Sequence, residues 1–295
     1  MEGALQVRRG GRRFKGILRE LSFALRRQIR QAATSNRLLP AFVIIGAQKG
    51  GTSSLYHYLG QHPHIAPALD KEVHFFDHHF ARGMDWYRAN FATSWYRDCS
   101  KRWYGHDIIT GEASPYYLFY PHASERIAST LPTVKLIAML RHPVNRAFSH
   151  YYHQVEAGRE RLSFEDACRA EPERLDGEIN KIMQNPCYES FNHTHFSYLS
   201  RGIYVDQLQA YKRHFPDEQM LILNSERFFA DPAAGTRQVI KFLGLPDVQI
   251  RDFQARNTRR YPAMSPQTRT YLIDYFAPYN QKLYDFLGTR FDWDR

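Results

Sequence analysis

A short apolar run, AFVII at residues 41–45, leads directly into the glycine-rich stretch GAQKGGTSS at residues 46–54. A continuous apolar run of this length predicts a strand buried on both faces of a parallel sheet. The residues from 52 to 61 predict a helix, which His62 and Pro63 end. A glycine turn between a strand and a helix forms an anion site, because the first amide groups of the helix point toward the turn.

The same alternation of strand and helix continues to the C-terminus. Apolar runs at 107–115, 134–140 and 219–224 predict further strands, and helices are expected over 144–156 and 231–243. Residues 265–287 predict one or two helices, interrupted near Pro278. Segment 157–201 has little periodicity, and we expect an irregular flap or a substrate-facing insertion there. The pattern predicts a single α/β domain with a central parallel sheet flanked by helices.

The net charge of +10 is concentrated in the first residues. Residues 1–37 hold ten Lys/Arg and two acidic residues, a net charge of +8, and include RRFKGILRELSFALRRQIRQ at 12–31. This stretch predicts a basic amphipathic helix, so we divide the chain into an arm, 1–37, and a catalytic domain, 38–295. Such an arm binds a membrane surface or a polyanion, or it packs on the body of the protein, which is the more frequent case.

Several classes of protein are disfavoured by composition. The three cysteines, Cys99, Cys168 and Cys187, have no metal-ligand spacing and do not form a disulfide framework, so we expect a reducing compartment and no metal. No stretch approaches the roughly 20 apolar residues of a membrane-spanning helix, and no apolar signal segment opens the chain. We therefore expect a soluble, cytoplasmic protein without a nucleic-acid partner.

The glycine-rich loop departs from the nucleotide-triphosphate loop G-x-x-x-x-G-K-[ST]. Its lysine, Lys49, precedes the glycine pair Gly50-Gly51, and the hydroxyl residues Thr52 and Ser53 follow directly. No apolar run ends in an aspartate suited to hold magnesium. The loop is therefore typical of a phosphate cradle that serves a donor other than ATP.

The stretch KEVHFFD at 71–77 places a carboxylate beside an imidazole. In an extended segment Glu72 and His74 point to the same side, which is the arrangement of a general-base pair. The neighbouring Phe75 and Phe76 are expected to raise the pKa of the carboxylate. A chance pair on a surface loop is the alternative interpretation.

Two basic stretches suggest further phosphate contacts. Arg141 directly follows the strand at 134–140, and Ser149 lies about two helical turns into the next helix. Together they are suited to hold a second phosphate group. The loop RNTRRYPAM at 256–264 carries Arg256, Arg259 and Arg260 and could close over a polyanionic nucleotide.

Taken together, these stretches resemble the sulfotransferases that use 3′-phosphoadenosine 5′-phosphosulfate (PAPS). The likeness is to the heparan-sulfate-type branch more than to the small-molecule cytosolic branch, and it extends from about residue 42 to residue 293. The matching stretches are KGGTSSLYHYLGQHP (49–63), KEVHFFD (71–77), GEASPYY (111–117), LRHPVNRAFSHYYH (140–153), RGIYVDQLQAYKRHFP (201–216), RRYPAM (259–264) and FDW (291–293).

The resemblance implies a donor site. The loop Lys49-Gly50-Gly51-Thr52-Ser53 would bind the 5′-phosphosulfate, with Lys49 neutralising charge on the bridging oxygen. Arg141 and Ser149 would hold the 3′-phosphate, and Arg259 would add phosphate contacts.

The resemblance also implies a catalytic group and an acceptor site. Glu72 matches the family's catalytic base, while His74 and Asp77 match its neighbours on the acceptor side. Such a transfer relies on positioning and electrostatics and needs no metal.

The chain departs from the family pattern on the acceptor side. Ala113 stands where relatives that modify glycosaminoglycans often carry a lysine, and Asn257-Thr258 replace a Lys-Gly pair. Neither the membrane anchor nor the C-terminal disulfide of lumenal relatives is visible, which favours a soluble, bacterial-type member. We expect a glycan or glycoconjugate hydroxyl as acceptor, with sugar-stacking candidates Tyr116, Tyr117, Tyr151, Tyr152, Phe191 and Tyr198. Core packing is the alternative role of these rings.

The sequence leaves other functions of the chain open. The acceptor could instead be an amine, a lipid or a small-molecule hydroxyl. A kinase-like phosphotransferase and a non-catalytic polyanion-binding protein are the alternatives from other functional classes. Composition and motifs give no oligomeric state.

Overall fold

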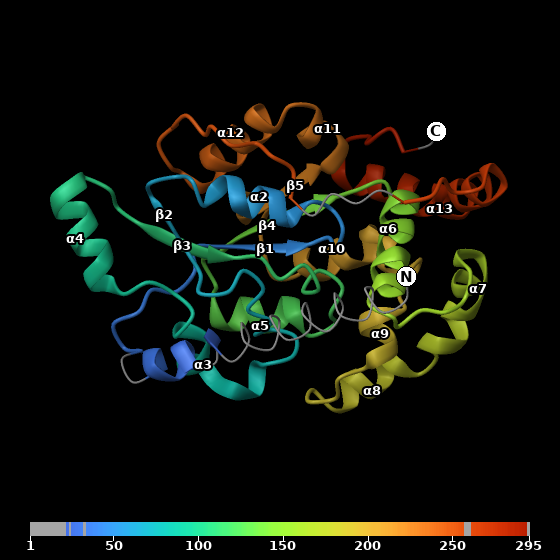
Figure 1. Cartoon of the computed structure of the whole chain (residues 1–295), viewed down its shortest axis with the longest axis horizontal. Coiled ribbons are helices and arrows are strands. Elements are labelled where there is room, and N and C mark those ends of the chain that lie inside the picture. The colour runs from blue at the N-terminus through green and yellow to red at the C-terminus, as the bar shows by residue number, and fades with distance from the viewer. Residues whose placement is uncertain (1–21, 24, 32–33, 257–260, 294–295) are drawn as a thin grey trace, which may run out of the picture.

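A five-stranded parallel sheet forms the centre of the protein (Figure 1). The computed structural model describes residues 22–23, 25–31, 34–256 and 261–293. The strands pair in the order β2-β3-β1-β4-β5, and their parallel arrangement is the one that the alternating pattern in the sequence predicts. Their bounds are β1 Phe42–Gly46, β2 Ile65–Pro67, β3 Ile109–Glu112, β4 Lys135–Leu140 and β5 Met220–Asn224.

Helices cover both faces of the sheet. Along β1, Phe42 and Ile44 pack against one helical layer, while Val43 and Ile45 pack against the other, because side chains of a strand alternate between faces. The first layer contains α2 Thr52–Leu59, α11 Ser225–Ala230 and α12 Pro232–Leu243. The second contains α3 Gly83–Arg88, α5 Ala123–Thr130 and α10 Tyr204–Lys212.

A group of helices extends the domain beyond the carboxyl ends of the strands. Segment 157–201, expected to be irregular, is mostly helical: α7 Phe164–Leu175, α8 Glu178–Gln184 and α9 Phe191–His195 follow α6 Pro143–Glu156. These helices have many polar residues, so the hydrophobic periodicity of a helix is not evident in the sequence. Side chains such as Phe164 and Ala167 nevertheless pack against α6 in a third apolar cluster. The expectation of an irregular flap was therefore wrong.

One long helix, α13 Pro266–Leu287, runs along this end of the molecule. It begins with a Ser265 cap on the amide of Thr268, and it continues through Pro278 instead of being interrupted there. A proline inside a helix costs about 3 kcal/mol. Buried residues on both sides of it, Phe276 and Leu283 among them, hold the helix together and offset that cost.

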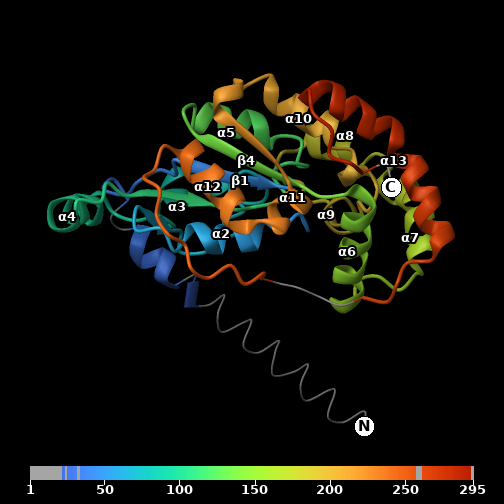
Figure 2. The same cartoon turned by 90° about the horizontal axis from the view of Figure 1, so that it is seen from above.

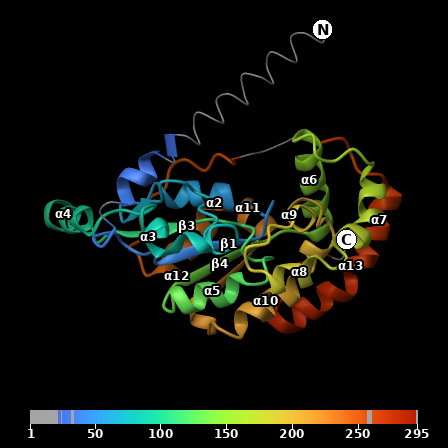
Figure 3. The ribbon, with the colours of Figure 1, turned by 90° about the horizontal axis from the view of Figure 1, so that it is seen from below.

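The remaining helix, α4 Ser94–Tyr104, stands apart from both layers. Figures 2 and 3 show it at the end of the molecule opposite α7 and α13. Single 3₁₀ turns occur at Phe80–Arg82, Ser200–Gly202 and Asp217–Gln219.

Candidate active site

The glycine-rich loop connects β1 to α2 at the carboxyl edge of the sheet. A β-carbon on Gly50 would lie 2.3 Å from the carbonyl oxygen of Met139, and one on Gly51 would lie 2.5 Å from the ring of Phe229. Gly51 also has a φ of 102°, which favours glycine. The two glycines therefore let the loop lie directly against β4 and α11, so that α2 begins beside a cavity.

The Gly50 amide has a different role from the one expected. It donates to the carbonyl of Ala47 at 2.9 Å and closes the turn. The first amides of a helix lack partners within the helix, so those at the start of α2, which begins at Thr52, are the candidates for binding an anion.

A cavity of about 640 Å³ brings most of the predicted donor residues together. Lys49, Gly50, Gly51, Thr52, Ser53, Arg141 and Ser149 line it, and so does Glu72. The guanidinium of Arg141 lies 3.2 Å from the Lys49 carbonyl oxygen, so the end of β4 meets the loop after β1. The buried hydroxyl of Ser149, on α6, lies 3.2 Å from that of Tyr261.

Sequence reasoning did not single out several other lining residues, among them Gln48, Asn145, His153, Ser225, Phe229 and Tyr261. Arg256 also lines the cavity, and its guanidinium contacts Asp252 at 3.0 Å and His57. Arg259 and Arg260 lie outside the described residues, so their proposed contacts stay predictions.

Glu72 lies in a chain of close polar contacts at the wall of this cavity. Its carboxylate accepts from the ammonium group of Lys71 at 2.6 Å and lies 3.4 Å from Nε2 of His74. Lys71 also donates to the hydroxyl of Ser53 at 3.0 Å, which connects the carboxylate to the phosphate loop. Lys71 lies in the motif KEVHFFD, but the sequence pattern does not indicate that it connects Glu72 to Ser53.

The pKa of Glu72 is shifted in the direction opposite to that expected. Burial acts to raise this pKa, but the hydrogen bond from His74 and the charge of Lys71 outweigh it and lower the pKa to about 2. The prediction of a raised pKa was wrong, because Phe75 and Phe76 are buried in the core, and the close polar contacts of Glu72 are to Lys71 and His74.

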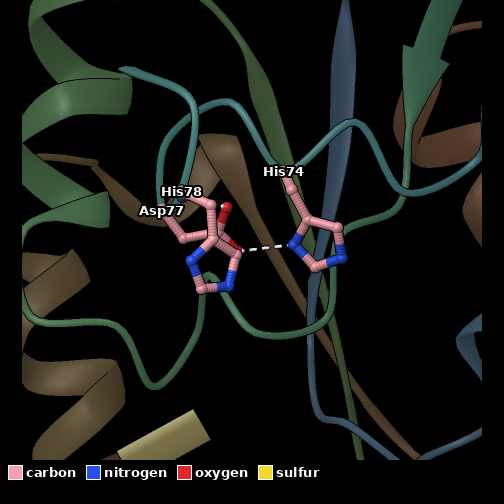
Figure 4. A group of neighbouring side chains, drawn as sticks. All are labelled: His74, Asp77 and His78. Atoms are coloured by element: carbon pink, nitrogen blue, oxygen red, sulfur yellow. Dashed lines mark hydrogen bonds and ion pairs between the residues drawn. The ribbon is translucent and has the colours of Figure 1, made fainter. Parts of the chain in front are cut away.

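His74, which contacts Glu72, also forms an ion pair with Asp77 (Figure 4). Nδ1 of His74 lies 2.7 Å from Oδ2 of Asp77. Burial acts to lower the pKa of His74, but Asp77 and then Glu72 raise it to about 10. The pKa of the fully buried Asp77 is lowered in turn by His74, against the effect of burial. At neutral pH His74 is therefore a cation held between two carboxylates.

A third side chain, His78, lies beside this pair (Figure 4). Ligand atoms of His74, Asp77 and His78 all lie within 4.8 Å of one another, a spacing that a metal ion could share. Asp77 instead stabilises the protonated form of His74, and a metal ligand must be the neutral imidazole.

A buried carboxyl group supports the loop that carries His74. Glu112, at the end of β3, accepts hydrogen bonds from Tyr87 at 2.7 Å and from Ser114 at 2.7 Å. Burial raises its pKa to about 7, although these hydrogen bonds oppose the shift. The Ser114 hydroxyl in turn accepts from the amide of His74 at 3.0 Å. Ala113 between them is fully buried, so this position provides no acceptor-side charge.

A second cavity, of about 350 Å³, lies on the far side of His74. It is lined by His74, His78, His79, Glu189, Ser190, Phe191, Thr194 and His195. Burial lowers the pKa values of His79 and His195 to about 4, so both are neutral at pH 7. Of the proposed stacking residues, Phe191 lines this cavity, whereas Tyr116, Tyr117 and Tyr198 are buried in the protein.

These features are the ones that the sequence predicts for a group-transfer site with a phosphorylated donor. A family model described as "Sulfotransferase domain" matches residues 39–270, which is most of the chain. The chain therefore belongs to the sulfotransferase family, whose sulfuryl donor is PAPS.

Named relatives and a solved structure agree with this assignment. The mouse heparan sulfate glucosamine 3-O-sulfotransferase 3B1 is 30% identical over 89% of this chain and 67% of its own length. The membrane-associated sulfotransferase kil1 of Dictyostelium discoideum is 28% identical over 86% of this chain and 66% of its own. The chain thus spans about two thirds of these curated relatives.

A sulfotransferase crystal structure from Alicyclobacillus acidocaldarius is 32% identical, with a TM-score of 0.65 over 88% of this chain and all of that one. The expected fold and family are confirmed. In the described part of the chain, none of the helices combines the length and apolar character needed to cross a membrane.

Proposed function

We propose that the protein transfers the sulfuryl group of PAPS to a hydroxyl of a carbohydrate or glycoconjugate. The observation that carries this proposal is a shared cavity: the loop from Lys49 to Ser53, the pair Arg141 and Ser149, and the carboxylate of Glu72 all line it. The cavity thus combines two places for anionic groups with a base, which is what transfer from a doubly phosphorylated donor requires.

On the donor side, the loop and the first turn of α2 would bind the 5′-phosphosulfate through amides, hydroxyls and the charge of Lys49. Arg141 and Ser149 would bind the 3′-phosphate. This second anion site distinguishes PAPS from ATP, and Arg259 is proposed to add to it from the late loop.

In the transfer step, the acceptor oxygen forms a bond to sulfur as the bond between sulfur and the phosphate oxygen breaks. The acceptor proton goes to Glu72, and adenosine 3′,5′-bisphosphate leaves with the electron pair. Lys49 would neutralise the charge that develops on the leaving oxygen, as preorganised cations do in group transfer. His74 would hold the carboxylate in place and contact the acceptor, with Asp77 keeping the imidazole oriented and charged.

The acceptor is proposed to enter through the cavity lined by α9 and the histidines. His74 lines this cavity and its Nε2 lies 3.4 Å from Glu72, so an acceptor bound there would contact the imidazole next to the base. The similarity to heparan sulfate glucosamine 3-O-sulfotransferases supports a carbohydrate acceptor. A cytoplasmic location stays a prediction of the sequence.

The test combines donor binding with transfer. Adenosine 3′,5′-bisphosphate should raise the melting temperature of the protein, and ATP with magnesium should raise it less. Labelled PAPS should then pass label to at least one member of a panel of glycans, lipids and phenols. Glu72→Gln should keep donor affinity and lower turnover about a hundredfold or more, since a general base contributes on this order.

The matched control is Glu125→Gln, which changes an exposed carboxylate on α5. It should leave both donor affinity and turnover unchanged. Full turnover in Glu72→Gln would remove Glu72 from the mechanism, and equal protection by ATP with magnesium would contradict the donor assignment.

A further inference from the structure

Helix α4 presents an aromatic surface to solvent. Trp95, Tyr96, Trp103 and Tyr104 are 51 to 71% exposed, although they are the largest side chains of the helix. Soluble proteins rarely gather large exposed aromatic groups on one element without a binding partner. Within α4, only Ser100 is buried.

The aromatic groups share one side of α4. At 100° per residue, Trp95, Tyr96 and Trp103 fall within an arc of about 100°. Tyr104 widens this arc to about 180°, which includes the buried Ser100, while Arg97, Lys101, Asp98 and Arg102 lie on the remaining side. The helix is thus amphipathic, with a Trp/Tyr side and a charged side.

The described part of the N-terminal arm lies at the same end of the protein. The amide of Ser94, the first residue of α4, donates to the carbonyl of Asn36 at 2.6 Å, and Arg37 forms a single antiparallel bridge with Thr93, the N-cap of the helix. These bonds tie the arm to the first residues of α4.

Residues 25–31 of the arm are helical and dock on the body through arginines. The guanidinium of Arg27 donates to Asn90 at 2.9 Å, and that of Arg30 donates to the carbonyl of Phe91 at 2.6 Å. The aliphatic residues Leu25 and Ile29 remain mostly exposed. The arm therefore adds outward apolar groups at the same end of the protein as α4 (Figure 1).

Charge at this end is predominantly positive. The described arm residues and α4 together carry Arg26, Arg27, Arg30, Arg37, Arg97, Lys101 and Arg102, and their only acidic residue is Asp98. Lys101 also pairs with Asp107, just after the helix. Trp and Tyr interspersed with Lys and Arg are typical of proteins at the interface of an anionic bilayer.

We propose that α4 and arm residues 25–31 form a peripheral binding surface for a bilayer with anionic headgroups. A projecting helix, exposed on most sides, suits insertion into a deformable headgroup layer better than a shape-complementary contact with a folded protein. The chain passes from α4 into the start of β3, so this surface lies at the amino ends of the strands. The donor cavity opens at the carboxyl ends and would face away from the membrane.

The test is flotation of the full chain with phosphatidylcholine vesicles, with and without phosphatidylserine. Binding should require phosphatidylserine and weaken with added salt. Trp95→Ser combined with Trp103→Ser should lower affinity at least tenfold. Arg97→Gln combined with Arg102→Gln should lower it about 25-fold, because each basic residue near an anionic surface contributes roughly a factor of five.

Two features make the result specific to α4. Of the four tryptophans, Trp86 and Trp293 are buried, so a blue shift of emission on adding vesicles reports on Trp95 and Trp103. Tyr271→Ser is the matched control, because Tyr271 is an equally exposed aromatic residue on α13 and should not affect binding. Circular dichroism would show that the variants are folded.

Three results would overturn the proposal. The wild type could fail to bind vesicles, or the tryptophan pair could be dispensable for binding. The same pair could also convert a dimer to a monomer in sedimentation without any vesicle binding, which would make α4 an interface between copies of the chain.

Discussion

Asp77→Asn tests the electrostatics of the candidate site. Asp77 is fully buried and lies 2.7 Å from His74, whose pKa it helps to raise to about 10. A close opposite charge shifts a pKa by about 1–3 units. Asparagine keeps the shape and the hydrogen-bonding capacity but loses the charge. We therefore expect the pKa of His74 to fall by about 2 units, to near 8, in the variant.

Folding stabilises the protonated form of His74, because its pKa is raised in the folded protein. This fixes how the free energy of unfolding depends on pH. In the wild type the contribution of His74 is complete below its ordinary pKa of 6.5 and is lost as the pH rises through about 10. In the variant this contribution to stability is lost at a pH about 2 units lower. The variant should be less stable by up to about 3 kcal/mol below pH 8, at about 1.4 kcal/mol per unit. The lower cost of burying a neutral side chain offsets part of this, and the difference should fade toward pH 10.

The assay is a pH titration of the His74 ring by NMR, together with urea unfolding at acidic, neutral and alkaline pH. Asp206→Asn, on the exposed side of α10, is the matched control and should leave both measurements unchanged. Turnover at pH 9 should fall in Asp77→Asn because His74 becomes neutral there. A native His74 that titrates near its ordinary pKa, or that is insensitive to Asp77→Asn, would refute this account of the site.

Three further perturbations have defined outcomes. Gly51→Ala forces a side chain into a left-handed conformation and onto the ring of Phe229, so its melting temperature should fall well below that of Gly158→Ala, where φ is 72° but the space is open. Ser149→Ala should weaken binding of adenosine 3′,5′-bisphosphate about tenfold or more, and equal weakening toward adenosine 5′-phosphosulfate would argue against a 3′-phosphate contact. Lys71→Met should raise the pKa of Glu72 from about 2 toward 4.5, and an acid limb absent from the wild-type pH–rate profile should then appear near pH 4.

The donor cavity could be predicted from the sequence because its parts are local. The loop at 46–54 is determined by nearby residues alone. These are the apolar run before it, its glycine pair and the start of the helix after it. Arg141 directly follows β4, and parallel strands bring such positions to one edge of the sheet. Both the loop and the position of Arg141 can therefore be predicted without knowledge of tertiary contacts.

The charge state of Glu72 could not be predicted in this way. It depends on the contacts that the Lys71 and His74 side chains make with the carboxylate, and His74 has a positive φ of 53°, which the motif does not predict. The buried role of Glu112 could not be predicted for a related reason. An acidic residue at a strand end is ordinarily exposed, and only the packing of Tyr87 and Tyr117 around it makes it a buried hydrogen-bond acceptor.

The contacts of Lys71 suggest how a carboxylate of such low pKa could act as a base. Lys71 connects Ser53, in the phosphate loop, to Glu72, so its charge is shared between the two. An anionic donor group bound at the loop would attract the same ammonium group and would also repel the carboxylate. Both effects raise the pKa of Glu72, and a base is more effective when its pKa approaches the working pH. On this argument Glu72 gains basicity when the donor is bound, and before that it is held as an ion pair.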